Sequence, residues 1–153
     1  MAALELPRHA HMQIAFFLRQ LTGFWFFMLG RWKLFELPGG ARTVADQFFV
    51  GAYKDSILPV WSLRTVGWVD PFVEFVCGLL LIFGLGVRPA TWFLMGLLVM
   101  VTFGHQLKEP TYSMAEHVLP AAIGLIGVAA LAGPKDVLTI DFLLRPLVRR
   151  LRK

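Results

Sequence analysis

Hydrophobic residues gather into four long stretches, separated by shorter segments that contain charges, prolines or glycines. The stretches cover about residues 13–35, 67–87, 89–107 and 116–133. A transmembrane helix needs about 20 mainly apolar residues, so each stretch has roughly the length of one span. The pattern predicts an all-α fold, a four-transmembrane-helix bundle, in which residues 1–153 form a single membrane domain.

The four stretches differ in the polar groups that they carry. Residues 89–107 contain no formal charge, whereas Arg19 interrupts the first stretch, and Asp70 and Glu74 lie in the second. Residues 116–133 are rich in Ala and Gly, which allow helices to approach each other closely in lipid. Ionisable side chains inside a bilayer are costly, and they are therefore candidate functional groups.

The longest connection, residues 36–66, is expected to contain a further helix. Its Leu-Pro-Gly-Gly sequence at residues 37–40 is typical of a turn. Thr43 can cap a helix that runs from Val44 to Lys54. This helix is amphipathic, so we expect it to lie in the membrane interface.

Composition and charge support a membrane protein. Residues of hydrophobic type make up 57% of the chain and charged residues 16%, against about 25% charged residues in soluble domains. The net charge of +5 is concentrated at residues 145–153, which hold five basic and no acidic side chains. Four spans place both termini on the same side, and the basic tail at 137–153 predicts that this side is the cytoplasmic face of a bacterial-type inner membrane. We expect the tail to contact lipid head groups rather than nucleic acid.

Several polar side chains fall at a similar depth, in the outer half of the predicted bundle. Asp70 and Glu74 are four residues apart and therefore share one face of a helix. His105 and His117 lie near the outer ends of the next two spans. Glu74 is expected to have a functional or partner-contact role, or else to form a structural ion pair with Arg31 or Lys33.

Two cofactors are compatible with these groups. A quinone site needs an apolar slot with a carboxylate or His near the head group. Asp70 and Glu74 are the candidates for proton exchange there, and the aromatic residues that could line the slot are Phe72, Phe75, Trp92 and Phe103. Alternatively, His105 and His117 could ligate a haem iron axially. No other metal site is expected. Because Cys77 is the single cysteine, an intramolecular disulfide is excluded, and we expect Cys77 to be a small buried side chain.

The sequence resembles the DoxX family of small four-helix membrane proteins over about residues 18–143. The resemblance rests on the order and spacing of these residues: Leu18-Arg19, Gly23, Phe27 to Gly30, Lys33-Leu34, Pro71, Glu74, Gly78 to Leu81, Gly84-Leu85, Arg88, Ala90, Gly133 and Leu138-Thr139-Ile140-Asp141. It implies a compact bundle. The family includes subunits associated with sulfur-compound oxidation and quinone reduction.

Four side chains match family positions and are implied as site residues, namely Arg19, Lys33, Glu74 and Arg88. Asp141 also matches, and we expect it to cap or anchor the cytoplasmic end. The chain lacks the paired cysteines of thiol-active relatives, so the resemblance does not carry that chemistry over to it.

Three functions remain open at this stage. The first is a membrane subunit of a quinone-linked redox complex, which anchors a partner or helps to form a quinone pocket. The second is a non-catalytic assembly protein of a larger complex, and the third is a haem-binding electron carrier. The expected partners are the lipid bilayer and other subunits or further copies of the chain, and any enzymatic role is at most that of a non-autonomous subunit.

Overall fold

The computed structural model describes residues 7–108, 118–133, 138–141 and 143–144, and this part of the chain is helical without any strand. The chain forms, in order, α1 (Arg8–Arg31), η1 (Trp32–Glu36), α2 (Gly40–Thr43), η2 (Val44–Gly51), α3 (Val60–Phe83), α4 (Val87–Lys108) and α5 (Leu119–Leu131). The segments η1 and η2 are π-helical. The all-α prediction is therefore confirmed for the described residues.

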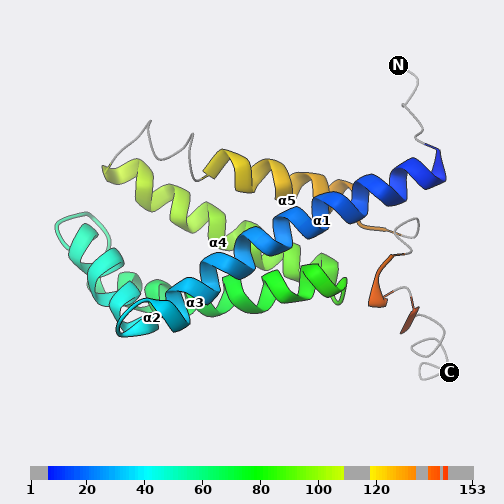
Figure 1. Cartoon of the computed structure of the whole chain (residues 1–153). Coiled ribbons are helices and arrows are strands. Elements are labelled where there is room, and N and C mark those ends of the chain that lie inside the picture. Colours follow the sequence, from blue (N-terminus) through cyan, green and yellow to red (C-terminus); the bar gives the residue numbers. More distant parts are fainter. Residues whose placement is uncertain (1–6, 109–117, 134–137, 142, 145–153) are drawn as a thin grey trace, which may run out of the picture.

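The long helices α1, α3, α4 and α5 alternate in direction and pack side by side (Figure 1). The segments α2 and η2 lie at one end of this bundle, which we call the loop end. The joint between α3 and α4 lies at the opposite end, which we call the turn end, together with the start of α1. Apolar side chains from all four helices form the core, among them Phe26, Leu81, Leu94 and Leu125.

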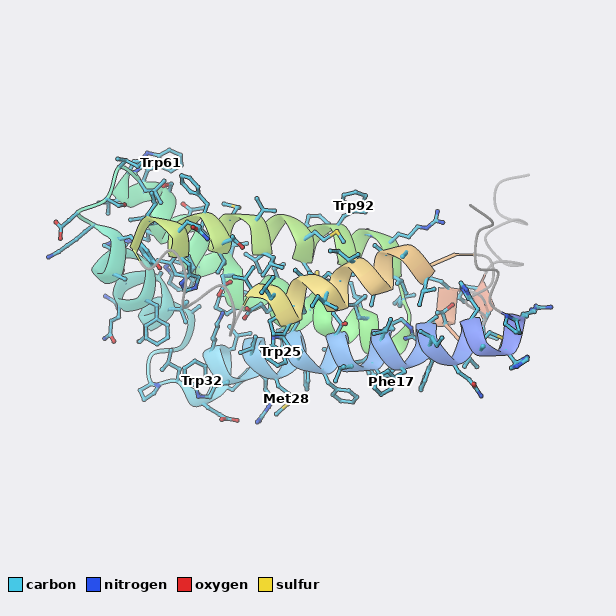
Figure 2. The ribbon with its side chains drawn as sticks, turned by 90° about the horizontal axis from the view of Figure 1, so that it is seen from above. Phe17, Trp25, Met28, Trp32, Trp61 and Trp92 are labelled. Carbon is cyan, nitrogen blue, oxygen red and sulfur yellow. The ribbon has the colours of Figure 1, made fainter. Side chains whose placement is uncertain are left out.

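Within the described residues, three helical segments are long and apolar enough to cross a membrane: Arg8–Glu36, Val60–Phe83 and Val87–Leu107. Their outer faces carry large apolar side chains such as Phe17, Met28 and Trp92 (Figure 2), as expected for a lipid-facing surface. The apolar helix α5 has 13 residues, or about 20 Å, which is shorter than a hydrocarbon core. The predicted fourth span therefore stays a prediction, and part of it, residues 116–117, lies outside the described residues.

The second span begins earlier than the sequence predicted. The helix starts at Val60, directly after Pro59 in an extended conformation, and not near Gly67. Its first two turns are amphipathic: Leu63 is buried, whereas Trp61 and Arg64 are exposed. Such a mixed segment lacks the uniform hydropathy by which a span is recognised in a sequence.

The first connection is helical as predicted, but Thr43 does not cap a helix there. Thr43 already has helical backbone angles within α2, and its hydroxyl donates to the carbonyl of Pro38. Helix α2 begins instead after Gly39, whose φ of +86° suits glycine. The turn that the sequence predicted at residues 37–40 thus sets the start of the helix one turn earlier.

The helical segment η2 packs on α3. Val44 and Ala45 are fully buried. A Cβ atom on Gly67 would lie 2.6 Å from the Cα of Ala45, so the absence of a side chain at Gly67 allows this contact. The segment η2 is therefore packed against the bundle. Its position in the membrane interface stays a prediction.

Glycine also brings α1 and α3 into close contact. A Cβ atom on Gly78 would overlap the backbone of Phe27, and one on Gly30 would overlap the backbone of Phe75. The sequence had assigned small-residue packing to residues 116–133. Gly124 of α5 does meet Thr22 of α1, but it meets side-chain atoms, whereas Gly78 and Gly30 meet the backbone of the facing helix.

A buried arginine closes the turn end of the bundle. Arg19 donates through Nη1 to the carbonyls of Leu81 (2.6 Å) and Ile82 (3.0 Å), at the end of α3. Its Nη2 donates to the carbonyl of Leu138 (2.5 Å). The last carbonyls of a helix lack intrahelical partners and carry partial negative charge, so a cation is stabilised there. This contact explains how a charge at position 19 is accommodated in an otherwise apolar helix.

Asp141 caps a helix start at the same end, and the cytoplasmic location predicted for it stays a prediction. Its carboxylate accepts hydrogen bonds from the backbone N–H groups of Gly86 (2.9 Å) and Val87 (3.1 Å), where α4 begins. Gly84 and Gly86 have positive φ angles of 67° and 57° and form the tight α3–α4 turn. The anion bound at this helix start is the protein's own carboxylate.

We expect Asp141→Ala to lower the free energy of unfolding by about 0.5–2 kcal/mol, because two N–H groups lose their acceptor. Thermal unfolding in detergent measures this loss. Asp55→Ala is the matched control, since Asp55 is exposed in the loop before α3. Equal stability of the two variants would contradict the capping role.

Candidate functional site

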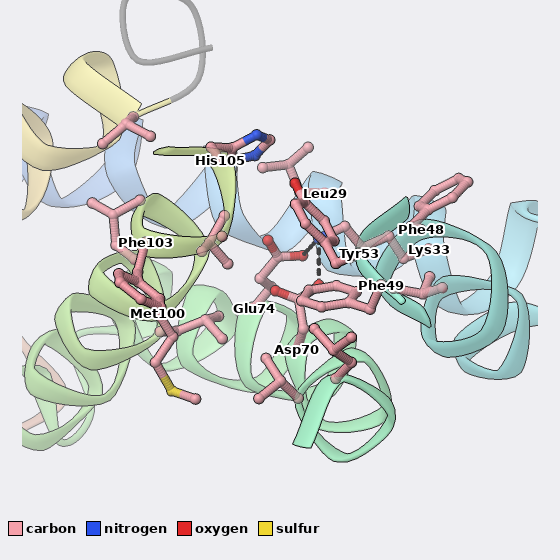
Figure 3. Close-up of a pocket in the computed structure, with 18 of the residues that line it drawn as sticks. Leu29, Lys33, Phe48, Phe49, Tyr53, Asp70, Glu74, Met100, Phe103 and His105 are labelled. Carbon is pink, nitrogen blue, oxygen red and sulfur yellow. Dashed lines mark hydrogen bonds and ion pairs between the residues drawn. The ribbon is translucent and has the colours of Figure 1, made fainter. Parts of the chain in front are cut away.

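Three charged side chains meet near the loop end of the bundle, between η1 and α3. The Nζ atom of Lys33 lies 2.6 Å from Oδ2 of Asp70 and 2.8 Å from Oε2 of Glu74 (Figure 3). Asp70 is 1% exposed and Glu74 is 6% exposed. The two carboxylates therefore share one face of α3, as their spacing of four residues predicted, and one ammonium group bridges them.

This arrangement decides between the two predicted partners of Glu74. Arg31 instead forms an ion pair with Glu36, and both of those side chains are exposed. Lys33 is the cation that reaches Glu74. We call Lys33, Asp70 and Glu74 the charge cluster.

The charge cluster forms part of the wall of a cavity of about 620 Å³. The rest of the wall is mainly apolar and comes from α1, η2, α3, α4 and the start of α5. Its lining includes Trp25, Phe26, Leu29, Val44, Phe48, Phe49, Leu63, Val66, Leu97, Met100, Phe103, Val118 and Ala121. A mainly apolar cavity with a few polar groups on one wall is typical of a small-molecule site.

His105 also lines this cavity, as its predicted depth suggested. It comes from α4, whereas the charge cluster comes from η1 and α3 (Figure 3). The structure thus brings Lys33, Asp70, Glu74 and His105 to one chamber. His117 lies outside the described residues, so the predicted pairing of the two histidines at a haem stays a prediction.

The aromatic lining differs from the one expected. Of the four aromatic residues named from the sequence, Phe103 lines the cavity. Phe75 packs instead against Phe27 and Phe35, with ring centroids 5.2 and 5.5 Å away. Phe72 and Trp92 are exposed on the outer surface. The expectation was wrong for these three because helical spacing gives the depth of a residue but not the neighbour that its side chain faces.

The basic residues implied by the family resemblance fall into two groups. Lys33 belongs to the charge cluster, whereas Arg19 and Arg88 lie at the turn end. Arg88 is exposed and reaches the carbonyl of Ala132 at 3.5 Å. The structure therefore does not bring Arg19 or Arg88 to the cavity.

The first connection supplies lining residues that the sequence analysis did not name. Phe48 and Phe49 of η2 and Tyr53 after it form one side of the cavity (Figure 3). The Tyr53 ring lies next to Gly104 of α4, where its Cζ atom would be in ordinary contact, at 3.9 Å, with an added Cβ. The apolar face of the helix predicted at residues 44–54 was the feature of the sequence that could have indicated these side chains. The sequence does not show that they line the cavity, because this depends on how η2 packs against the bundle.

The described residues contain no group of three or more His, Cys, Asp or Glu side chains that could hold a metal ion. Cys77 is buried in the core, as predicted. Within the described part of the chain, the cavity and its charge cluster are the arrangement best suited to chemistry. The carboxylates can accept or release protons, and the apolar walls can hold a ring or an aliphatic tail.

Fold and site together define a helical membrane protein with a mainly apolar cavity and buried ionisable groups at one wall. The family model named DoxX matches residues 14–107. The chain belongs to the DoxX family, as its sequence resemblance predicted. No curated protein and no solved structure matches the chain.

Proposed function

We propose that this protein is a membrane subunit of a quinone-linked redox complex and that its cavity receives the head group of a lipophilic quinone. The observation that carries this proposal is the position of the charge cluster on the wall of an apolar cavity. A quinone contributes reversible electron uptake when bound. The residues of the chain would hold its ring, exclude water and exchange protons at its oxygen atoms.

The size and composition of the cavity support this ligand class. Small-molecule sites typically have volumes of about 300–1,000 Å³, and this cavity of about 620 Å³ falls within that range. One oxygen of the buried Asp70, Oδ1, has no hydrogen-bond partner among the described residues. A polar head group next to this wall could relieve such a cost, provided that a small side-chain movement opens the contact.

The route into the cavity also favours a lipophilic ligand. Trp25 and Leu29 of α1, and Met100 and Phe103 of α4, line the cavity and are also exposed. These helices are candidate membrane spans. A ligand dissolved in the bilayer could therefore reach these lining residues from the lipid-facing surface without crossing an aqueous phase.

The association with a redox complex is supported by the family resemblance, since the DoxX family includes subunits associated with quinone reduction. We propose that partner subunits, in the same inner membrane, deliver or receive the electrons. Purification in mild detergent, with analysis of co-purifying proteins and bound quinone, tests this part. A protein that purifies alone, without quinone, and that nevertheless maintains the abundance of a partner would favour the assembly function instead.

Glu74→Gln is expected to lower quinone-dependent turnover of the complex by about 100-fold, because it removes a carboxylate that exchanges protons at the head group. Glu36→Gln is the matched control: it makes the same chemical change at an exposed ion pair. Turnover is measured after assembly has been shown to be equal. Unchanged turnover in Glu74→Gln would remove Glu74 from the proton role.

A further inference from the structure

We infer that the cavity selects the reduced, hydroxyl-bearing form of its ligand, a hydroquinone, over the oxidised quinone. This inference rests on the proposed function and specifies which redox form the site holds more tightly. Its basis is the balance of hydrogen-bond donors and acceptors in the charge cluster.

Acceptors outnumber donors in this cluster. Two carboxylates offer four oxygen atoms, and Lys33 engages one oxygen of each, Oδ2 of Asp70 and Oε2 of Glu74. This leaves Oε1 of Glu74, which takes no part in the ion pair, as the acceptor at the cavity. Oδ1 of Asp70 also has no hydrogen-bond partner among the described residues, but it is buried beneath the cavity surface. In Figure 3 the second oxygen of Glu74 points away from Lys33, toward the cavity.

The supply of donors is smaller. An ammonium group has three N–H donors, and two of those on Lys33 face the carboxylates. The other polar side chains of the chamber, such as His105 and Tyr53, can act either as donors or as acceptors. They can therefore adapt to either redox form, so the charge cluster decides the preference.

Charge favours the same form. One ammonium and two carboxylates leave an excess of one negative charge when all three groups are ionised. A hydroxyl donor placed at a carboxylate oxygen makes a charge-assisted hydrogen bond. A quinone carbonyl has no hydrogen to donate, and placing it there would bring two acceptors together. The hydroquinone therefore gains a contact at this wall that the quinone cannot make.

The test compares the affinities of the two redox forms for the intact protein in lipid nanodiscs. Isothermal titration calorimetry under anaerobic conditions uses one short-chain benzoquinone and its hydroquinone. We expect the hydroquinone to bind at least about tenfold more tightly, as a hydrogen bond to a charged group implies. This comparison uses the unmodified chain, so it does not depend on the folding of a variant.

Two variants then test whether Asp70 and Glu74 cause the tighter binding of the hydroquinone. Glu74→Gln and Asp70→Asn each replace a carboxylate by an amide, which has both a donor and an acceptor, and each should narrow the preference. Glu36→Gln should keep it, because Glu36 lies outside the lining of the cavity. A preference unchanged in both cavity variants would overturn the role of the two carboxylates.

The outcomes for the unmodified chain separate the two proposals. If the quinone binds as tightly as the hydroquinone or more tightly, the inference is overturned and the proposed function stands. If neither form binds, the proposed function is overturned as well.

Discussion

Replacing Lys33 by Met is expected to lower the free energy of unfolding by about 3–5 kcal/mol, the usual cost of removing one partner from a buried ion pair. Asp70 and Glu74 would then face each other on one turn of α3, both buried and without their shared cation. Thermal unfolding in detergent, followed by circular dichroism, measures the loss.

The control for this experiment is Arg31→Met, two residues before Lys33. This substitution breaks the exposed ion pair between Arg31 and Glu36. Surface pairs contribute at most about 1 kcal/mol, so this variant should unfold close to the unmodified protein. Combining Lys33→Met with Asp70→Asn and Glu74→Gln should restore much of the stability, because no buried charge is left unpaired. A single Lys33→Met variant as stable as Arg31→Met would show that the three charged groups do not depend on one another.

Replacing Gly78 by Val is expected to cost at least about 3 kcal/mol and to prevent normal packing of α1 on α3. Overpacking with side chains typically costs about 1–3 kcal/mol. Here the new Cβ would overlap the backbone N of Phe27 and would lie 2.8 Å from its Cα and 2.9 Å from the carbonyl oxygen of Gly23. Backbone atoms cannot move aside by changing rotamer, so the helices themselves would have to separate.

Gly96→Val is the matched control, because no atom lies within 4 Å of a Cβ at Gly96. Valine is no worse than glycine in a helix, so this variant should fold as well as the unmodified protein. Size-exclusion chromatography in detergent and thermal unfolding distinguish the two variants. If Gly78→Val elutes and unfolds like Gly96→Val, α1 and α3 do not approach as closely as described.

The charge cluster carries a cost that stability alone does not require. A buried carboxylate oxygen without a hydrogen-bond partner, such as Oδ1 of Asp70, is unfavourable. An apolar residue at that position would avoid the cost. Proteins tend to retain such local conflicts where a function uses them, and this conflict lies on the wall of the cavity. The Lys33→Met variant therefore measures what the charge cluster contributes to stability, and the binding comparison measures what it contributes to ligand affinity.

The sequence by itself determined the features that depend on local spacing. Asp70 and Glu74 share a face because four residues make about one helical turn. Cys77 is buried, as predicted. The cap that Asp141 forms on the start of α4, 54 and 55 residues away along the chain, belongs instead to the tertiary structure. Hydropathy predicted four spans, and three candidate spans are found among the described residues. Family membership followed from the order of motifs along the chain and is confirmed over residues 14–107.

Tertiary structure decided which groups meet. Arg31 and Lys33 are two residues apart, so on a regular α-helix they would point about 200° apart, and the sequence could not tell which one faces α3. The chain passes into the π-helical segment η1 at Trp32, where Leu37 bonds to the carbonyl of Trp32, and this change of winding sets the direction of Lys33. The aromatic lining likewise depends on η2 folding back onto Gly67. Local spacing fixes the depth and face of a residue on its own helix, whereas its partner depends on helix rotation and on the packing of distant segments.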